Sequence, residues 1–209
     1  MKAKIWKNYF DIVILPPKEV QDFSIKLSKQ LYKSGAKWSL GKKSYLPHIS
    51  LFHIPVKLNK FNNFITDLEE TVKSFKHGKL EINDLLFWQP HLSVLLMTDK
   101  PEWIKRLYLK IIKDSLKSFD WDYNIEKLWS AEKLPKLCQK NLKKYGTPMF
   151  GRYFIPHITL GTFKKREEAE RAFKKLKIKK FSMKIKSIYV CQLGTSHSCQ
   201  KILKKINFK

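Results

Sequence analysis

Cysteine, acidic side chains and long apolar runs are all scarce in this sequence of 209 residues. The three cysteines, Cys138, Cys191 and Cys199, are odd in number and show no Cys-x-x-Cys spacing. This argues against a disulfide framework and favours a reducing compartment. No apolar stretch approaches transmembrane length, and the short run at 12–15, which follows Asp11, is typical of a strand rather than a signal sequence. We therefore expect a cytoplasmic protein with no membrane partner.

The shortage of acidic residues leaves a large positive charge. Lysine and arginine number 43 against 18 aspartates and glutamates, so the net charge is +25. A field of this strength indicates an anionic partner, such as nucleic acid, a nucleotide or an acidic surface. Most of the excess is lysine, which suits general attraction to phosphates better than bidentate reading of bases. A lysine-rich solvated surface explains the charge equally well, so charge alone does not decide the partner.

Hydrophobic residues make up 43% of the chain, which argues against disorder. The length and pattern predict one α+β domain over residues 1–209, with largely antiparallel sheets. We expect strands at 9–15, 48–55, 79–87, 91–98, 157–162, 181–191 and 201–208. We expect helices at 18–35, from an Asn59 cap to 75, at 101–116 and at 166–177. Residues 120–147 indicate a broken helix that ends at Gly146.

Two stretches of seven residues share one pattern: aromatic, aliphatic, Pro, His, Ile, hydroxyl, Leu. They are YLPHISL at 45–51 and FIPHITL at 154–160. Side chains two positions apart point to the same face of a strand, so His48 projects with Ser50. His157 projects with Thr159 for the same reason. If the two strands lie side by side, two imidazoles and two hydroxyls converge on a volume that suits a phosphodiester.

Such a cluster has the chemistry that phosphodiester cleavage requires. One group must take a proton from the attacking water or hydroxyl, and another must give one to the departing oxygen. Two histidines that titrate near neutrality can divide these roles, and the hydroxyls can hydrogen-bond the phosphate oxygens. We expect no cofactor and no metal. Cys191, His197 and Cys199 offer three ligands without a fourth and are expected to lie at a hairpin turn.

Two other histidines fit the short pattern only in part. His91 belongs to a third His-x-Ser, but it lacks the preceding aromatic–aliphatic pair and follows a predicted hairpin turn. We expect it at the surface. His53 falls out of step with His48 and Ser50 unless a bulge intervenes, so we assign it a structural place.

The tandem motifs, half a chain apart, resemble those of the two-histidine (2H) phosphoesterase superfamily. The 2′-5′ RNA ligase and 2′,3′-cyclic phosphodiesterase branch is the most similar. The resemblance implies a bilobal, pseudo-two-fold fold, with two mostly antiparallel sheets around a central cleft and helices outside. It also implies that His48 and His157 are the catalytic acid–base pair. Ser50 and Thr159 would then bind the phosphate.

Two features depart from the pattern of that family. Many relatives place an arginine just after the second motif, where this chain continues with Gly161-Thr162-Phe163-Lys164. The segment before the second motif, residues 120–153, is longer than a minimal member of the family requires and is predicted to be an insertion. A lid, a substrate-specific wall and a surface elaboration all remain open, and we favour the last.

Residues beside the motifs are expected to contact substrate. They are Tyr45, Lys43, Arg152, Tyr153 and Phe154, although Tyr45 and Phe154 could equally pack under the strands. The resemblance implies metal-independent cleavage, or reverse ligation, of 2′,3′-cyclic or 2′-5′ phosphodiesters. RNA ends or small cyclic oligonucleotides would be the partners of a monomer. A hydrolase of signalling nucleotides that silences immunity, and a non-catalytic RNA-binding protein, are the alternatives.

Overall fold

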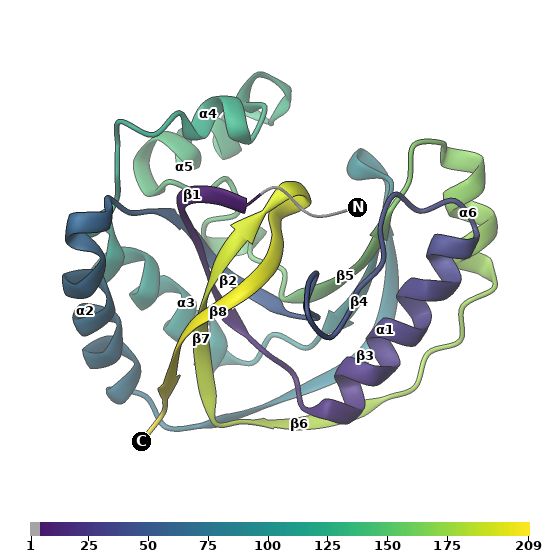
Figure 1. The fold of residues 1–209 in the computed structure, drawn as a ribbon, viewed down its shortest axis with the longest axis horizontal. Coiled ribbons are helices and arrows are strands. Elements are labelled where there is room, and N and C mark those ends of the chain that lie inside the picture. Colours follow the sequence, from purple (N-terminus) through teal and green to yellow (C-terminus); the bar gives the residue numbers. More distant parts are fainter. Residues whose placement is uncertain (1–4) are drawn as a thin grey trace.

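The computed structural model describes residues 5–209 and contains two four-stranded antiparallel sheets (Figure 1). The first sheet has the strand order β2-β1-β7-β8. The second has the order β5-β4-β3-β6. The strands of the first sheet are β1 (Ile5–Ile14), β2 (Ile49–Pro55), β7 (Ser187–Gly194) and β8 (Ser198–Asn207). Those of the second are β3 (Gly78–Trp88), β4 (Ser93–Thr98), β5 (His157–Thr162) and β6 (Phe181–Ile185).

Each sheet is covered by two helices. α2 (Phe61–Lys73) and α3 (Glu102–Ser115) pack against each other and onto the first sheet. α1 (Lys18–Lys33) and α6 (Arg166–Lys174) pack onto the second (Figure 1). The helices bury one apolar stripe each, as their 3.6-residue periodicity predicts. Two short helices, α4 (Ile125–Leu128) and α5 (Lys136–Tyr145), lie beside the start of β1.

The chain crosses between the sheets before it reaches the first motif. After β1, helix α1 packs against β5 of the other sheet, and the following loop then returns to β2. Two backbone hydrogen bonds fix this loop: Lys37 N–H donates to Thr162 O at 2.8 Å, and Leu46 N–H donates to the Cys199 carbonyl at 3.0 Å. The approach to the first motif is therefore tied to the strand that carries the second.

The predicted α+β class and antiparallel sheets are confirmed. Two local predictions were wrong. Residues 181–191 are not one strand, because the chain changes sheets at Lys186: β6 pairs with β3, whereas β7 pairs with β1. Asn59 does not cap a helix, since it lies in a 3₁₀ turn and α2 begins at Phe61.

The predicted stop of the broken helix is confirmed. Gly146 ends α5 with φ +68°, and an added Cβ would collide with the Phe119 ring. Both constraints favour glycine here. None of the helices within residues 5–209 combines the length and apolarity that crossing a bilayer requires.

Candidate active site

The two motif strands lie against each other although they belong to different sheets. β2 forms one edge of the first sheet and β5 one edge of the second, and these two strands are in contact (Figure 1). Each begins next to its prolyl-histidine, because proline cannot donate to a ladder. The fold therefore brings together the two stretches whose sequences match.

The two motif histidines are held in the same way. Nδ1 of His48 donates to the carbonyl of Leu46 at 2.7 Å, and Nδ1 of His157 donates to that of Ile155 at 2.6 Å. A carbonyl only accepts, so both hydrogen bonds place the proton on Nδ1. Nε2 is consequently the atom that each ring has available for proton transfer.

Burial lowers the pKa of both histidines below the usual value. The two rings differ in the charges around them. At His48, Asp11 acts against the effect of burial and His53 adds to it, whereas at His157 the charges of His48 and His53 both lower the pKa further. The charge of His48 is thus felt at His157.

A buried carboxylate joins the first motif. Asp11, on β1, is 0% exposed, and its Oδ2 accepts a hydrogen bond from Ser50 Oγ at 2.7 Å. The same oxygen lies 3.1 Å from Nε2 of His53 and 3.5 Å from Nε2 of His48. His53 Nε2 also lies 3.3 Å from the Ser50 hydroxyl. Ser50, His53 and Asp11 thus form one polar cluster next to His48.

The prediction that His53 points away from Ser50 was wrong, because the required bulge is present. Along β1, Val13 pairs with Ser50 and Ile12 with Phe52, so the register skips Leu51. The extra residue turns His53 to the same face as Ser50. Sequence reasoning missed Asp11 altogether. The available signal was an acidic residue inside the apolar run Phe10–Ile14, because a charged side chain is rarely buried without a partner.

Aromatic rings pack around the far side of His53. The ring centroids of His53 and Trp129 are 5.6 Å apart, those of His53 and His197 5.3 Å, and those of Trp129 and His197 5.0 Å. Burial lowers the pKa of His197 to about 3, so its imidazole is neutral at pH 7. Trp129 belongs to the predicted insertion at 120–153. At this residue the segment packs against His53 and His197.

The hairpin turn expected around His197 is present. Gly194 pairs with Ser198, which closes the turn between β7 and β8. Cys191 and Cys199 are buried, and a hydrogen bond between their thiols raises the pKa of Cys191. Among residues 5–209, no group of three or more His, Cys, Asp or Glu side chains is arranged to hold a metal ion.

The other residues expected to contact substrate occupy different environments. Phe154 is only 4% exposed and stacks on Tyr108 at 3.9 Å, so it packs in the core and does not face a ligand. Tyr45 is half-buried and stacks on Trp38. Lys43 and Arg152 are exposed, and the Arg152 guanidinium donates to the hydroxyl of the half-buried Tyr153 at 3.2 Å.

The second motif repeats the register of the first. Leu95 of β4 pairs with Thr159 and Val94 with Gly161, so the ladder skips Leu160 just as it skips Leu51. One step further, Ser93 pairs with Thr162, in the places that correspond to Asp11 and His53. The hydroxyls of Ser93 and Thr162 are hydrogen-bonded at 3.2 Å.

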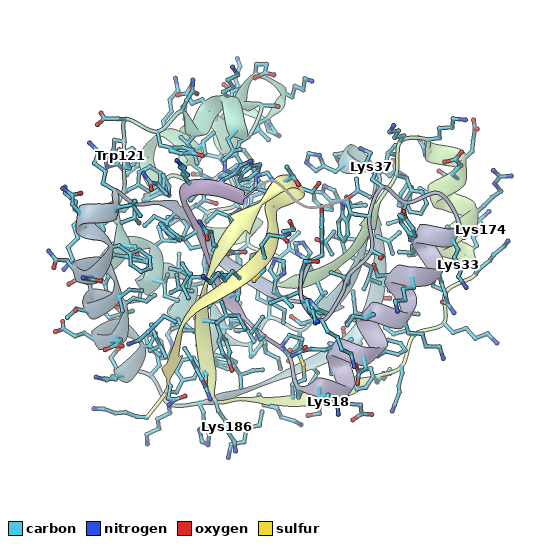
Figure 2. All side chains as sticks on the ribbon, in the orientation of Figure 1. Lys18, Lys33, Lys37, Trp121, Lys174 and Lys186 are labelled. Atoms are coloured by element: carbon cyan, nitrogen blue, oxygen red, sulfur yellow. The ribbon has the colours of Figure 1, made fainter. Side chains whose placement is uncertain are left out.

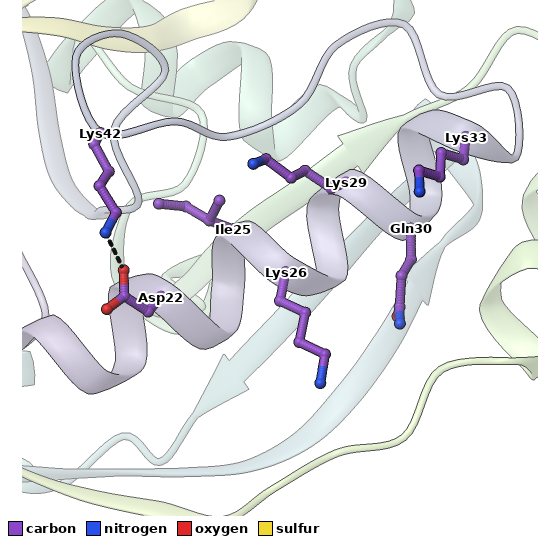
Figure 3. A pocket seen from close by; sticks show the side chains of 7 residues that line it. All are labelled: Asp22, Ile25, Lys26, Lys29, Gln30, Lys33 and Lys42. Atoms are coloured by element: carbon purple, nitrogen blue, oxygen red, sulfur yellow. Dashed lines mark ion pairs between the residues drawn. The ribbon is translucent and has the colours of Figure 1, made fainter.

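Lysines cover the outside of the molecule (Figure 2). A hollow of about 430 Å³ on α1 gathers four of them (Figure 3). It is lined by Asp22, Ile25, Lys26, Lys29, Gln30, Lys33 and Lys42. Lys42 pairs with Asp22 at 2.9 Å and lies in the loop that leads to the first motif. The only acidic residue lining the hollow is therefore already paired.

Comparison with known proteins gives matches in fold only. No protein-family model matches this sequence, and no curated protein matches it in sequence. Apo LigT of E. coli aligns over 100% of this chain and 99% of its own, with a TM-score of 0.58 and 12% identity. The chain has a LigT-like fold.

Other solved structures agree with this assignment. TT0787 of Thermus thermophilus aligns over 95% of this chain and 97% of its own, with a TM-score of 0.62 and 10% identity. A structure described as a phosphoesterase covers 100% of this chain and 99% of its own, with a TM-score of 0.57 and 13% identity. The predicted resemblance to the 2′-5′ RNA ligase branch is confirmed at the level of fold.

Proposed function

We propose that this protein is a metal-independent phosphodiesterase that acts on 2′,3′-cyclic or 2′-5′ linkages of RNA or nucleotides. The observation that carries the proposal is the matched pair of histidines on two touching strands, each with Nδ1 tied to a carbonyl and Nε2 available. LigT, whose fold this chain shares, has been solved with 3′-AMP, ATP and NADP⁺. These nucleotide ligands support a nucleotide substrate here.

The reaction requires that one proton be removed from the nucleophile and that one proton be given to the leaving oxygen. For a 2′,3′-cyclic phosphate, one imidazole removes a proton from water, and the water oxygen bonds to phosphorus. The bond from phosphorus to the 3′ oxygen breaks, and the second imidazole gives that oxygen a proton. The product is a 2′-phosphate with a free 3′ hydroxyl. Proton exchange with solvent restores both rings. Ligation follows when a 5′ hydroxyl takes the place of water: one imidazole removes its proton as its oxygen bonds to phosphorus, and the other gives a proton to the departing 3′ oxygen.

RNA is favoured over a small signalling nucleotide by the basic hollow on α1. Its lysines lie next to the loop that leads into the first motif, where they can attract a phosphate backbone that extends from the site. A hydrolase of cyclic oligonucleotides or 2′-5′ oligoadenylate would not need this surface. We propose that the chain acts as a monomeric bilobal domain in the cytoplasm, to which residues 120–153 add a wall beside the site.

The test is a panel of substrates: cyclic-phosphate RNA ends, 2′-5′ dinucleotides and cyclic dinucleotides, with products resolved by mass. We expect turnover that survives EDTA. Replacing His48 or His157 by Ala should lower the rate on the order of 10²–10⁴-fold. His91→Ala is the matched control, because His91 is exposed in a third His-x-Ser and should leave the rate unchanged.

Two outcomes would count against the proposal. Loss of turnover on chelation would contradict a metal-free reaction. Unchanged RNA affinity in the doubly substituted protein, with no turnover by the wild type on any substrate of the panel, would favour the non-catalytic RNA-binding alternative.

A further inference from the structure

Asp11 is a fully buried carboxylate that the proposed reaction does not use. Three groups face it: the Ser50 hydroxyl and Nε2 of His53 from β2, and Nε2 of His48, which immediately precedes β2. From β7, Cys191 pairs with it across the ladder, and from its own strand it faces the buried phenol of Tyr9. Burial, and then Asp11, raises the pKa of the Tyr9 phenol. The hydrogen bond to Cys199, with burial and Asp11 after it, raises the pKa of the Cys191 thiol, so both groups stay neutral at pH 7. The positive partners available to it are therefore imidazoles.

The contact with Asp11 commits the Ser50 hydroxyl. A serine has one O–H donor, and in this structure that donor points to Asp11 Oδ2 at 2.7 Å. It cannot at the same time donate to a phosphate oxygen. Thr159 faces Leu95 across the ladder and has no carboxylate at the corresponding place, where Ser93 stands instead. The Thr159 hydroxyl is consequently the better donor to phosphate.

The same contact makes the two histidines unequal. With Nδ1 of His48 donating to Leu46, a neutral ring would present the Nε2 lone pair 3.5 Å from a carboxylate oxygen. The negative charge stabilises a protonated ring, and because 3.5 Å is longer than a normal hydrogen bond, its Nε2–H remains available to a substrate oxygen. The charged groups that act on His157 are the imidazoles of His48 and His53, which disfavour a second positive charge.

We propose that Asp11 is a positioning residue: its charge favours the protonated form of the His48 ring, and it holds the Ser50 hydroxyl, so that Thr159 rather than Ser50 donates to the phosphate. The assignment rests on the proposed function. His157 Nε2 takes the proton of water as its oxygen bonds to phosphorus, and His48 Nε2 gives its proton to the 3′ oxygen as that bond to phosphorus breaks. His53 supports Asp11 through its 3.1 Å contact, in a plane fixed by stacking on Trp129 and His197.

The pH dependence of the rate tests this division. The rising limb then reports deprotonation of His157, and the falling limb reports deprotonation of His48. Asp11→Asn removes the charge that favours protonated His48, so the falling limb should move to lower pH by about one unit or more. The rising limb should stay in place. Movement of the rising limb alone would assign His48 as the base and overturn the proposal.

Matched variants separate this test from the test of function itself. Ser93→Ala changes the corresponding position of the second motif and should leave both limbs unmoved, and Asp11→Glu, which keeps the charge, should restore the falling limb. NMR titration of the His48 and His157 rings needs no substrate. It should show a lower pKa for His48 alone in Asp11→Asn, and an unchanged His48 would refute the proposal even if no substrate is ever found.

A second pair of variants applies if Asp11→Asn fails to fold. Thr159→Val removes the proposed phosphate donor and should lower kcat on the order of 10²-fold or more. Ser50→Ala should lower it much less and should shift the falling limb. Equal losses in the two variants, without a shift, would contradict the proposal.

Discussion

The two motif strands share a register but differ in the residues next to it. In both halves the ladder skips the leucine after the hydroxyl and then pairs the residue three positions beyond that hydroxyl with the neighbouring strand. In the first half this pair is His53 with Asp11, and in the second it is Thr162 with Ser93. The backbone register is therefore the same in both halves, whereas only the first half places a carboxylate, that of Asp11, beside its motif. A symmetric scaffold can in this way hold two identical histidines in different protonation states.

Beyond the loss of turnover, the largest effect that we expect concerns stability in acid. It should depend on His197, in the sheet that holds the first motif. The pKa of His197 is lowered to about 3 by burial, against about 6.5 in an unfolded chain. Because the folded value is the lower one, this group stabilises the protein above pH 6.5, and that contribution is lost as the pH falls toward 3. Between pH 6.5 and 5 the loss should be about 2 kcal/mol.

Urea unfolding of His197→Phe at these pH values measures the loss. The phenyl ring keeps the stacking and cannot titrate, so the free energy of unfolding should depend less on pH than in the wild type. His77→Phe removes an exposed histidine and should leave the dependence as it was. An identical slope in the wild type and His197→Phe would show that His197 is not the origin.

A charge placed in the second half should reduce the difference between the halves. Ser93→Asp puts a carboxylate where the register corresponds to Asp11, and it should raise the pKa of His157. The rising limb of the rate profile should then move to higher pH by about one unit, which lowers the rate by about tenfold at pH values below the pKa of His157. Ser93→Asn, of similar size but neutral, is the control. A shift of the falling limb instead would indicate that the second half does not contain the base.

The smallest effect should come from the surface of α1. Replacing Lys26, Lys29 and Lys33 by Ala should raise KM for long RNA several-fold and flatten its salt dependence. KM for a dinucleotide should not change, because the role proposed for the hollow is to attract backbone that extends beyond the motifs. Three exposed lysines elsewhere, Lys184, Lys186 and Lys205, provide the control. Equal effects of both triple variants would attribute the preference to net charge alone.

The sequence predicted the residues of the motifs and the class of the fold, because both depend on local pattern. Matched heptapeptides identify His48 and His157, and apolar periodicity places most helices and strands. The contact between Asp11 and His53 could not be predicted from local pattern, because it depends on which strand pairs with β2 and on a bulge of one residue. Residues 181–191 were misread for a related reason: a continuous apolar pattern does not reveal that the chain leaves one sheet for another.

The order of strands in the first sheet also bears on when the protein can become active during synthesis. β1, which carries Asp11, is flanked by β2 and by β7, and β8 then completes the sheet from the far end of the sequence. A nascent chain that has displayed both histidines still lacks two of the four strands that hold the first of them. The chain must therefore be made through β8 before this half can close, and such long-range pairing favours slow folding.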